Sequence, residues 1–117
     1  MARIPAPPLL MLWLATSLWA APAVFRIGGA ENDYGKDVTV DGQGNIIVAG
    51  YVAGRADLDP GAGERAVTAR PPADVCLVKL DGSGKFVWGF AVGGVAADMP
   101  HSVVCDGEGN IYVTGYF

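Results

Sequence analysis

Short apolar segments separated by glycine-rich turns run through most of the chain. Each segment is about five to eight residues long, is enriched in Val, Ile, Leu and aromatic residues, and is bounded by Gly, Asp or Pro. This pattern predicts strands at residues 37–41, 45–51, 74–80, 85–92, 102–106 and 110–116, with a possible short strand at 66–69. In residues 74–80 apolar side chains alternate with other apolar side chains, so we expect this strand to be more buried than an amphipathic one.

An Asp-Gly-x-Gly turn joins these segments in pairs, beginning at Asp41, Asp81 and Asp106. An Asp side chain can accept hydrogen bonds from the backbone two residues on, and Gly accepts positive φ, so each turn is typical of a β-hairpin. Two such hairpins make a unit of four antiparallel strands, which is the strand count of one propeller blade. The connection between the two hairpins, residues 53–73, is rich in Pro and Gly.

The sequence repeats after 65 residues, so that Phe90 corresponds to Phe25. When Phe25–Val52 is placed over Phe90–Phe117 without a gap, 13 of 28 positions are identical. The identities include both Gly-Gly pairs, the Asp-Gly-x-Gly-Asn turns and the following Gly-Tyr. Self-similarity at a fixed period is the signature of a repeat architecture.

The order of motifs resembles the bacterial SBBP-type β-propeller repeat, in the variant that carries an Asp-Phe-Asp-Pro-Gly loop. The matching series is Gly28-Gly29, Asp33, Val38-x-Val40-Asp41, Gly44-Asn45, Val48, Gly50, Asp57-x-Asp59-Pro60-Gly61, Asp74-Val75-x-Leu77-Val78-Lys79-Leu80-Asp81, Gly84 and Trp88. The chain departs from it at Leu58, where the loop usually has an aromatic residue, and at Cys76, where Phe is common. The resemblance implies an exported, repeat-built propeller protein and no shared catalytic residues.

The expected fold is therefore all-β, with about one and a half four-stranded antiparallel propeller blades after a signal peptide. Residues 25–89 form the first repeat and residues 90–117 the start of a second, truncated repeat. A propeller needs four to eight blades to cover its sheet faces. We therefore expect either the N-terminal part of a longer propeller or several copies that associate.

The N-terminus reads as a secretory signal peptide at residues 1–23. Arg3 supplies positive charge, residues 9–21 are uncharged and mostly apolar, and Ala21-Pro22-Ala23 resembles a cleavage site. The apolar run is short for a bilayer, which takes about 20 residues to span. We expect cleavage before Val24 and a secreted, periplasmic or cell-surface protein without a stable membrane span; the alternative is an uncleaved N-terminal anchor.

The composition excludes some classes of protein and leaves the state of the two cysteines open. With 8 basic and 12 acidic residues, a net charge of −4 and 17 Gly, the chain is a poor candidate for nucleic-acid binding or for a helical bundle. Cys76 and Cys105 could form a disulfide in an oxidising compartment, but as buried free thiols they would also fit their apolar segments.

Candidate chemistry is sparse. Asp57 and Asp59 are candidate calcium ligands, although the same side chains could simply cap turn amides. No catalytic constellation is visible: His101 is the only histidine, and it is expected to be exposed near the start of a strand. Trp88, Tyr51 and Tyr116 could stack on a carbohydrate, but packing between blades explains them better.

These observations favour a non-enzymatic exported repeat protein that acts as a structural or binding scaffold. A protein or carbohydrate ligand is possible, no cofactor is expected beyond possible calcium, and further blades or other copies are needed to close a ring. The alternatives are the N-terminal part of a propeller hydrolase, lyase or lactonase with catalytic residues beyond Phe117, and a self-assembling propeller of several chains.

Overall fold

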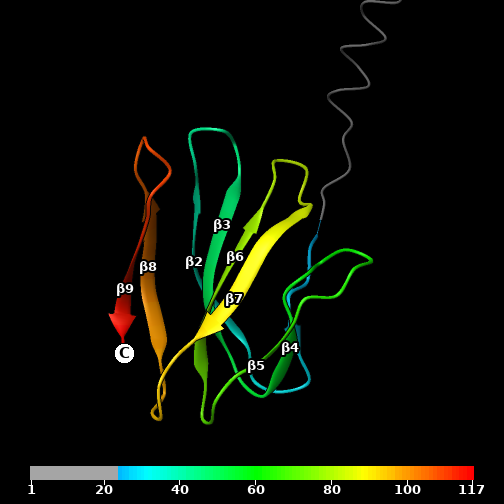
Figure 1. Ribbon diagram of the computed structural model, residues 1–117, viewed down its shortest axis with the longest axis vertical. Helices are drawn as coiled ribbons and strands as arrows, with labels where there is room; N and C mark the ends of the chain where they lie inside the picture. Colours follow the sequence, from blue (N-terminus) through cyan, green and yellow to red (C-terminus); the bar gives the residue numbers. More distant parts are fainter. Residues whose placement is uncertain (1–23) are drawn as a thin grey trace, which may run out of the picture.

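The computed structural model describes residues 24–117, and the predicted signal peptide at residues 1–23 lies outside this range. The described part of the chain consists of strands joined by turns and contains no helix (Figure 1). The strands are β1 (Gly28–Gly29), β2 (Tyr34–Val40), β3 (Ile46–Val52), β4 (Arg55–Asp57), β5 (Ala66–Thr68), β6 (Asp74–Leu80), β7 (Phe86–Val92), β8 (Met99–Cys105) and β9 (Ile111–Tyr116). The predicted all-β class is confirmed.

The main sheet has four antiparallel strands in the order β2-β3-β6-β7. Its two hairpins, β2–β3 and β6–β7, are those that the Asp-Gly-x-Gly turns predict. Strand β6 is the central element: six of its seven residues are buried, as its apolar sequence indicates. The sheet is built like one propeller blade, a meander of four strands.

A further hairpin, β8–β9, packs against one face of the main sheet. We call this the hairpin face; its buried residues are Ile47, Ala49 and Leu77, with Trp88 at its margin. Val103 lies in the same cluster and is 2% exposed, and Cys105, Ile111 and Val113 pack around it. Strand β8 runs beside β2, so the first strands of the two units are neighbours, as in successive blades.

The opposite face is partly covered by a small sheet of β1, β4 and β5, which we call the arm. We call the covered side of the main sheet the arm face; Val52, Cys76, Val78 and Leu80 belong to it. Leu58, directly after β4, is fully buried in this cluster. The sequence pattern predicts only β5 of the arm, because β1 and β4 are too short to show a period.

In each unit, a glycine of the second strand of the hairpin lies against the backbone of the first strand. A Cβ on Gly50 would lie 2.3 Å from the carbonyl oxygen of Tyr34, and a Cβ on Gly115 would lie 2.2 Å from that of Met99. Both contacts sit beside a β-bulge at the start of the hairpin. No side chain fits there, so Gly recurs at the equivalent position of each unit because the same bulge recurs.

Candidate functional site

The joint between the two units is held by the carboxylate of Asp37. Its Oδ2 accepts hydrogen bonds from the backbone N–H of Val103 and the hydroxyl of Ser102, each at 2.9 Å. Its Oδ1 accepts the N–H of Val38 at 2.9 Å. These three donors, with the Val103 amide foremost, hold the pKa of Asp37 below its usual range. The joint therefore combines an apolar contact with a group of hydrogen bonds at its edge; we call Asp37, Ser102 and Val103 the clasp.

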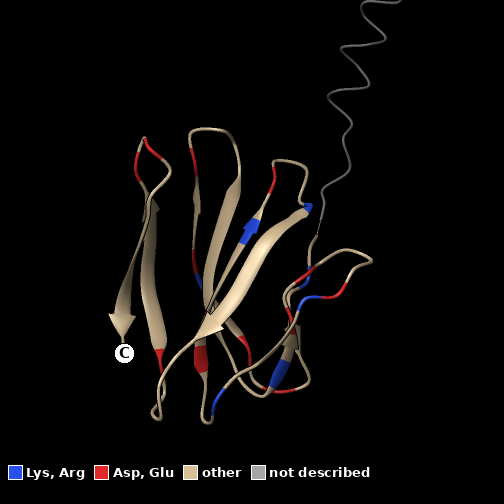
Figure 2. Ribbon diagram, viewed as in Figure 1, with Lys and Arg blue, Asp and Glu red and all other residues tan. Residues whose placement is uncertain are grey.

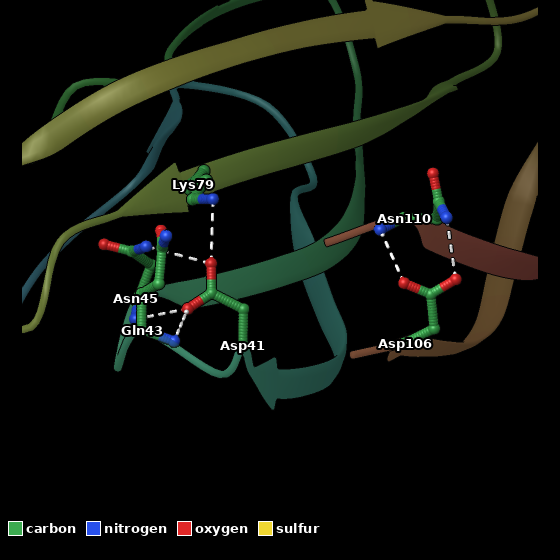
Figure 3. Close-up of polar contacts among 6 residues, drawn as sticks. All are labelled: Asp41, Gln43, Asn45, Lys79, Asp106 and Asn110. Atoms are coloured by element: carbon green, nitrogen blue, oxygen red, sulfur yellow. Dashed lines mark hydrogen bonds and ion pairs between the residues drawn. The ribbon is translucent and has the colours of Figure 1, made fainter. Parts of the chain in front are cut away.

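Three hairpin turns lie at the same end of the two units, and each begins with an acidic residue (Figures 1 and 2). Figure 3 shows the first: Asp41 Oδ1 accepts the N–H groups of Gln43 and Asn45, both at 2.9 Å. Its Oδ2 accepts the Asn45 side chain at 2.9 Å and the Lys79 ammonium at 2.8 Å. The Lys79 contact is the main cause that lowers the pKa of Asp41.

The turn of the second unit repeats this arrangement without the lysine. Asp106 Oδ1 accepts the N–H groups of Glu108 and Asn110, and Oδ2 accepts the Asn110 amide at 2.7 Å and the Tyr112 hydroxyl at 3.1 Å. These donors lower the pKa of Asp106, and the Asp106 contact raises that of Tyr112.

A cavity of about 250 Å³ separates the turns of the two units. It is lined by Asp41, Gly42, Gln43, Lys79, Gly107, Glu108 and Gly109. The lining offers peptide groups, one amide and charged side chains, but neither a histidine nor a cysteine. Lys79 is already paired with Asp41, so the arrangement suits hydrogen-bonded binding at a blade end better than proton transfer.

Asp57 and Asp59 lie in the loop that leaves β4. Asp57 Oδ1 accepts the N–H of Asp59 at 3.0 Å and of Arg65 at 2.9 Å, and Asp59 Oδ1 accepts the N–H of Gly61 at 2.7 Å. The Arg65 amide is the main cause that lowers the pKa of Asp57. Within residues 24–117 no group of three or more acidic, Cys or His side chains is arranged to hold a metal. Calcium binding by the two aspartates stays a prediction.

Two buried aspartates carry structural roles that the sequence analysis did not assign. Asp98 is 3% exposed, and its Oδ2 accepts the Gly94 N–H at 2.6 Å, as Asp33 does for Gly29 in the first unit. Asp74 is 4% exposed, and its Oδ2 accepts the Arg70 N–H at 2.9 Å. The recurrence of the Gly-Gly pair together with its aspartate in both units is the signal that could have revealed the shared loop role.

The two cysteines lie on different sides of the main sheet. Cys76 belongs to the arm face, Cys105 packs against the hairpin face, and both are free thiols. Burial, followed by the negative charge of Asp33, raises the pKa of Cys76 to about 11. Burial and the raised pKa both disfavour the thiolate form of Cys76.

The aromatic residues separate into different environments. Trp88 packs on the hairpin-face core, and Tyr51 stacks on Tyr34 with ring centroids 4.9 Å apart. Tyr116 is 70% exposed, and its ring lies edge-on to the ring of His101, which is itself exposed. The expected packing between blades is therefore present at Trp88 but not at Tyr116.

An apolar pocket of about 350 Å³ opens on the arm face beyond the arm. Val48, Val52, Val78 and Leu80 contribute its floor, and Phe25 lies at its margin. Its lining carries only one charged side chain, Asp33. The pocket could hold apolar side chains but provides few groups to orient a polar ligand.

Comparison with known proteins supports the repeat architecture. The chain is 34% identical, over 119 aligned positions, to the "Uncharacterized WD repeat-containing protein L264" of Acanthamoeba polyphaga mimivirus. The chain has a β-propeller-type repeat fold. The alignment covers 88% of this chain but spans only 8% of the length of the viral protein. No protein-family model and no solved structure matches the chain.

Residues 24–117 also include no helix of sufficient length and apolar character to cross a membrane. The predicted apolar segment at residues 9–21 lies outside this range.

Proposed function

We propose that the chain is an exported, non-enzymatic β-propeller repeat protein of the SBBP type that acts as a structural or binding scaffold. The observation that carries the scaffold role is the joint between the units. Equivalent residues of the two units build the same hairpin twice, and the second hairpin docks on the first through an apolar core with a polar clasp. Such joints are suited to stacking further units.

The binding surface of this scaffold is the end that carries the three hairpin turns. Loops at a blade end hold ligands in many propellers, because several blades meet there. The cavity between the first and second units presents peptide groups and the exposed side chains of Gln43 and Glu108. These groups fit a protein or carbohydrate partner that is recognised through hydrogen bonds. In the same proposal, residues 25–89 are one repeat and residues 90–117 the start of the next.

Export is tested by expressing the full chain with its own N-terminus in a bacterial host and measuring the intact mass in each cell fraction. We expect a species outside the cytoplasm that lacks residues 1–23 and begins at Val24. The variant Ala23→Asp, which alters the residue before the cleavage point, should accumulate at full length. Recovery of uncleaved wild-type chain from the cytoplasm alone would contradict export.

The scaffold role is tested by the mass of the polypeptide in its native source. A mass of 12.1 kDa less that of residues 1–23 would mean that the short chain acts by itself after cleavage. A mass several times larger would mean that these units open a larger propeller. An intrinsic hydrolase, lyase or lactonase activity of the purified native protein would contradict the non-enzymatic role.

A further inference from the structure

Part of the arm face remains open to solvent. The arm covers this face over β6 and β7, but on β2 the side chains of Val38 and Val40 are 59% and 60% exposed. The 350 Å³ pocket continues this apolar surface across β3 through Ile46 and Val48. We call Val38, Val40, Ile46 and Val48 the seat.

The second unit shows what such a seat contacts when it is covered. The residues equivalent to the seat in that unit are Val103, Cys105, Ile111 and Val113, and all four pack against the hairpin face of the first unit. Val103 is 2% exposed, whereas its counterpart Val38 is 59% exposed. The same surface is thus covered in the second unit, whereas in the first unit Ile46 and Val48 are half-buried and Val38 and Val40 are open to solvent.

The chain also carries an open counterpart of the β2–β3 part of the surface that covers a seat; Leu77 and Trp88 of that surface have no counterpart in β8–β9, and Ala49 is replaced by Thr114. On the outward side of β8–β9, Val104, Tyr112 and Tyr116 are 53%, 55% and 70% exposed. Their counterparts in the first unit are Thr39, Ile47 and Tyr51, and Ile47 is fully buried under β8–β9. We call Val104, Tyr112 and Tyr116 the outer hairpin surface.

We infer that the seat of one copy of this chain binds the outer hairpin surface of a second copy, in a head-to-tail contact. Each copy carries both surfaces, both are apolar, and the joint inside the chain shows the geometry that brings them together. Because the two surfaces differ, the contact is heterologous and can continue from copy to copy until a ring closes. The inference rests on the proposed scaffold function and names its partner.

The polar residues at the joint are compatible with this contact. Ser102 is the counterpart of Asp37 in the second unit, so a neutral hydroxyl takes the place of the clasp carboxylate there. In the contact between copies, Ser102 would therefore approach Asp37 of the next chain. A second aspartate at position 102 would instead bring two carboxylates together.

The test is sedimentation velocity of the full chain over a roughly hundredfold range of concentration. We expect the wild type to associate reversibly. Val38→Asp places a charge in the seat, and Tyr112→Asp places a charge in the outer hairpin surface. Each variant should weaken association about tenfold or more, because the charge would have to be buried in the contact. Val95→Asp is the matched control, because Val95 is 96% exposed in a loop away from both surfaces, and it should associate like the wild type.

Mixing the variants separates a head-to-tail contact from a symmetric one. Val38→Asp keeps the outer hairpin surface and Tyr112→Asp keeps the seat, so an equimolar mixture should form a dimer that grows no further. Circular dichroism checks that both variants fold, and Val38→Thr, which keeps a β-branched residue, should weaken association in the same direction but less. A wild type that stays monomeric, a Val38→Asp variant that associates like the wild type, or a mixture without dimer would each overturn the inference.

These outcomes are independent of the export experiment. A monomeric wild type removes the partner named here but leaves an exported scaffold of repeats. A chain that stays in the cytoplasm removes export but leaves the contact between copies.

Discussion

Two valines at equivalent positions of the repeat test whether the units pack as described. Val38 and Val103 lie in strands of the same design, and they are 59% and 2% exposed. Replacing each with Ala removes the same atoms and changes the strand propensity in the same way. The difference between the two substitutions therefore reports on burial in the joint alone.

The expected magnitude follows from these exposures. Two buried methyl-sized groups stabilise the fold by roughly 1.6 kcal/mol, and a cavity adds to the loss, so Val103→Ala should cost about 2–2.5 kcal/mol. Val38 buries less than half of its side chain and leaves no cavity when it is shortened. Val38→Ala should cost about 0.6 kcal/mol, which is close to the usual range for surface positions.

The measurement is urea unfolding followed by circular dichroism at a protein concentration low enough to keep the chain monomeric. We expect the free energies of unfolding of the two variants to differ by about 1.5 kcal/mol. Equal losses would refute the assignment of β8–β9 to the hairpin face. If copies associate through the seat, the cost of Val38→Ala should also rise with protein concentration, because association buries Val38.

Three further predictions concern pH, thiol reactivity and metal. The contacts of Asp41, of which the Lys79 contact is the largest, lower its pKa in the folded chain, so they stabilise the fold above the unfolded carboxyl pKa of about 3.9 and this contribution is lost as the pH falls further. Asp41→Asn should therefore make the loss of stability toward acid pH less steep, measured as the urea midpoint at each pH. An unchanged dependence on pH would contradict this role of Asp41. The Cys76 thiol, with its pKa raised to about 11, should react with a thiol reagent at pH 8 only when the chain is unfolded, whereas rapid reaction in the folded chain would show that it is accessible. If Asp57 and Asp59 bind calcium, millimolar Ca²⁺ should raise the melting temperature of the wild type and not that of Asp59→Asn; equal melting with Ca²⁺ and with a chelator would leave the two aspartates as turn caps.

The strands of the main sheet were predictable because their signals are local. Apolar runs between Asp-Gly-x-Gly turns place β3, β6, β7 and β9 within one or two residues of their observed bounds. The first strand of each unit begins three residues before its predicted start. Gly35 and Pro100 read as breakers, yet each sits at the bulge, where the strand pairing is irregular and their lack of strand propensity matters little.

The arm and the clasp were not predictable, because they depend on contacts between distant segments. Strand β1 is only Gly28–Gly29 and exists through its pairing with β4, from which the whole β2–β3 hairpin separates it in the sequence. The bond from Val103 to Asp37 spans 66 residues and forms only after the units dock. For the candidate site, the sequence reveals that Asp41 and Asp106 begin turns, but not that Lys79 reaches the first of them.

The construction of the three hairpin turns also bears on how this protein can change over evolutionary time. In each turn the aspartate and the fourth-position glycine meet the demands of the backbone, and those glycines have φ of 81°, 86° and 85°. The third position, held by Gln43, Ser83 and Glu108, is exposed in each turn and already differs among the turns, although the Ser83 hydroxyl donates a hydrogen bond to Asp81 Oδ1 at 2.6 Å. New side chains can therefore accumulate at these positions with little cost to folding, and each duplication of a full unit, which carries two such turns, would add two more variable positions to the same edge of the molecule.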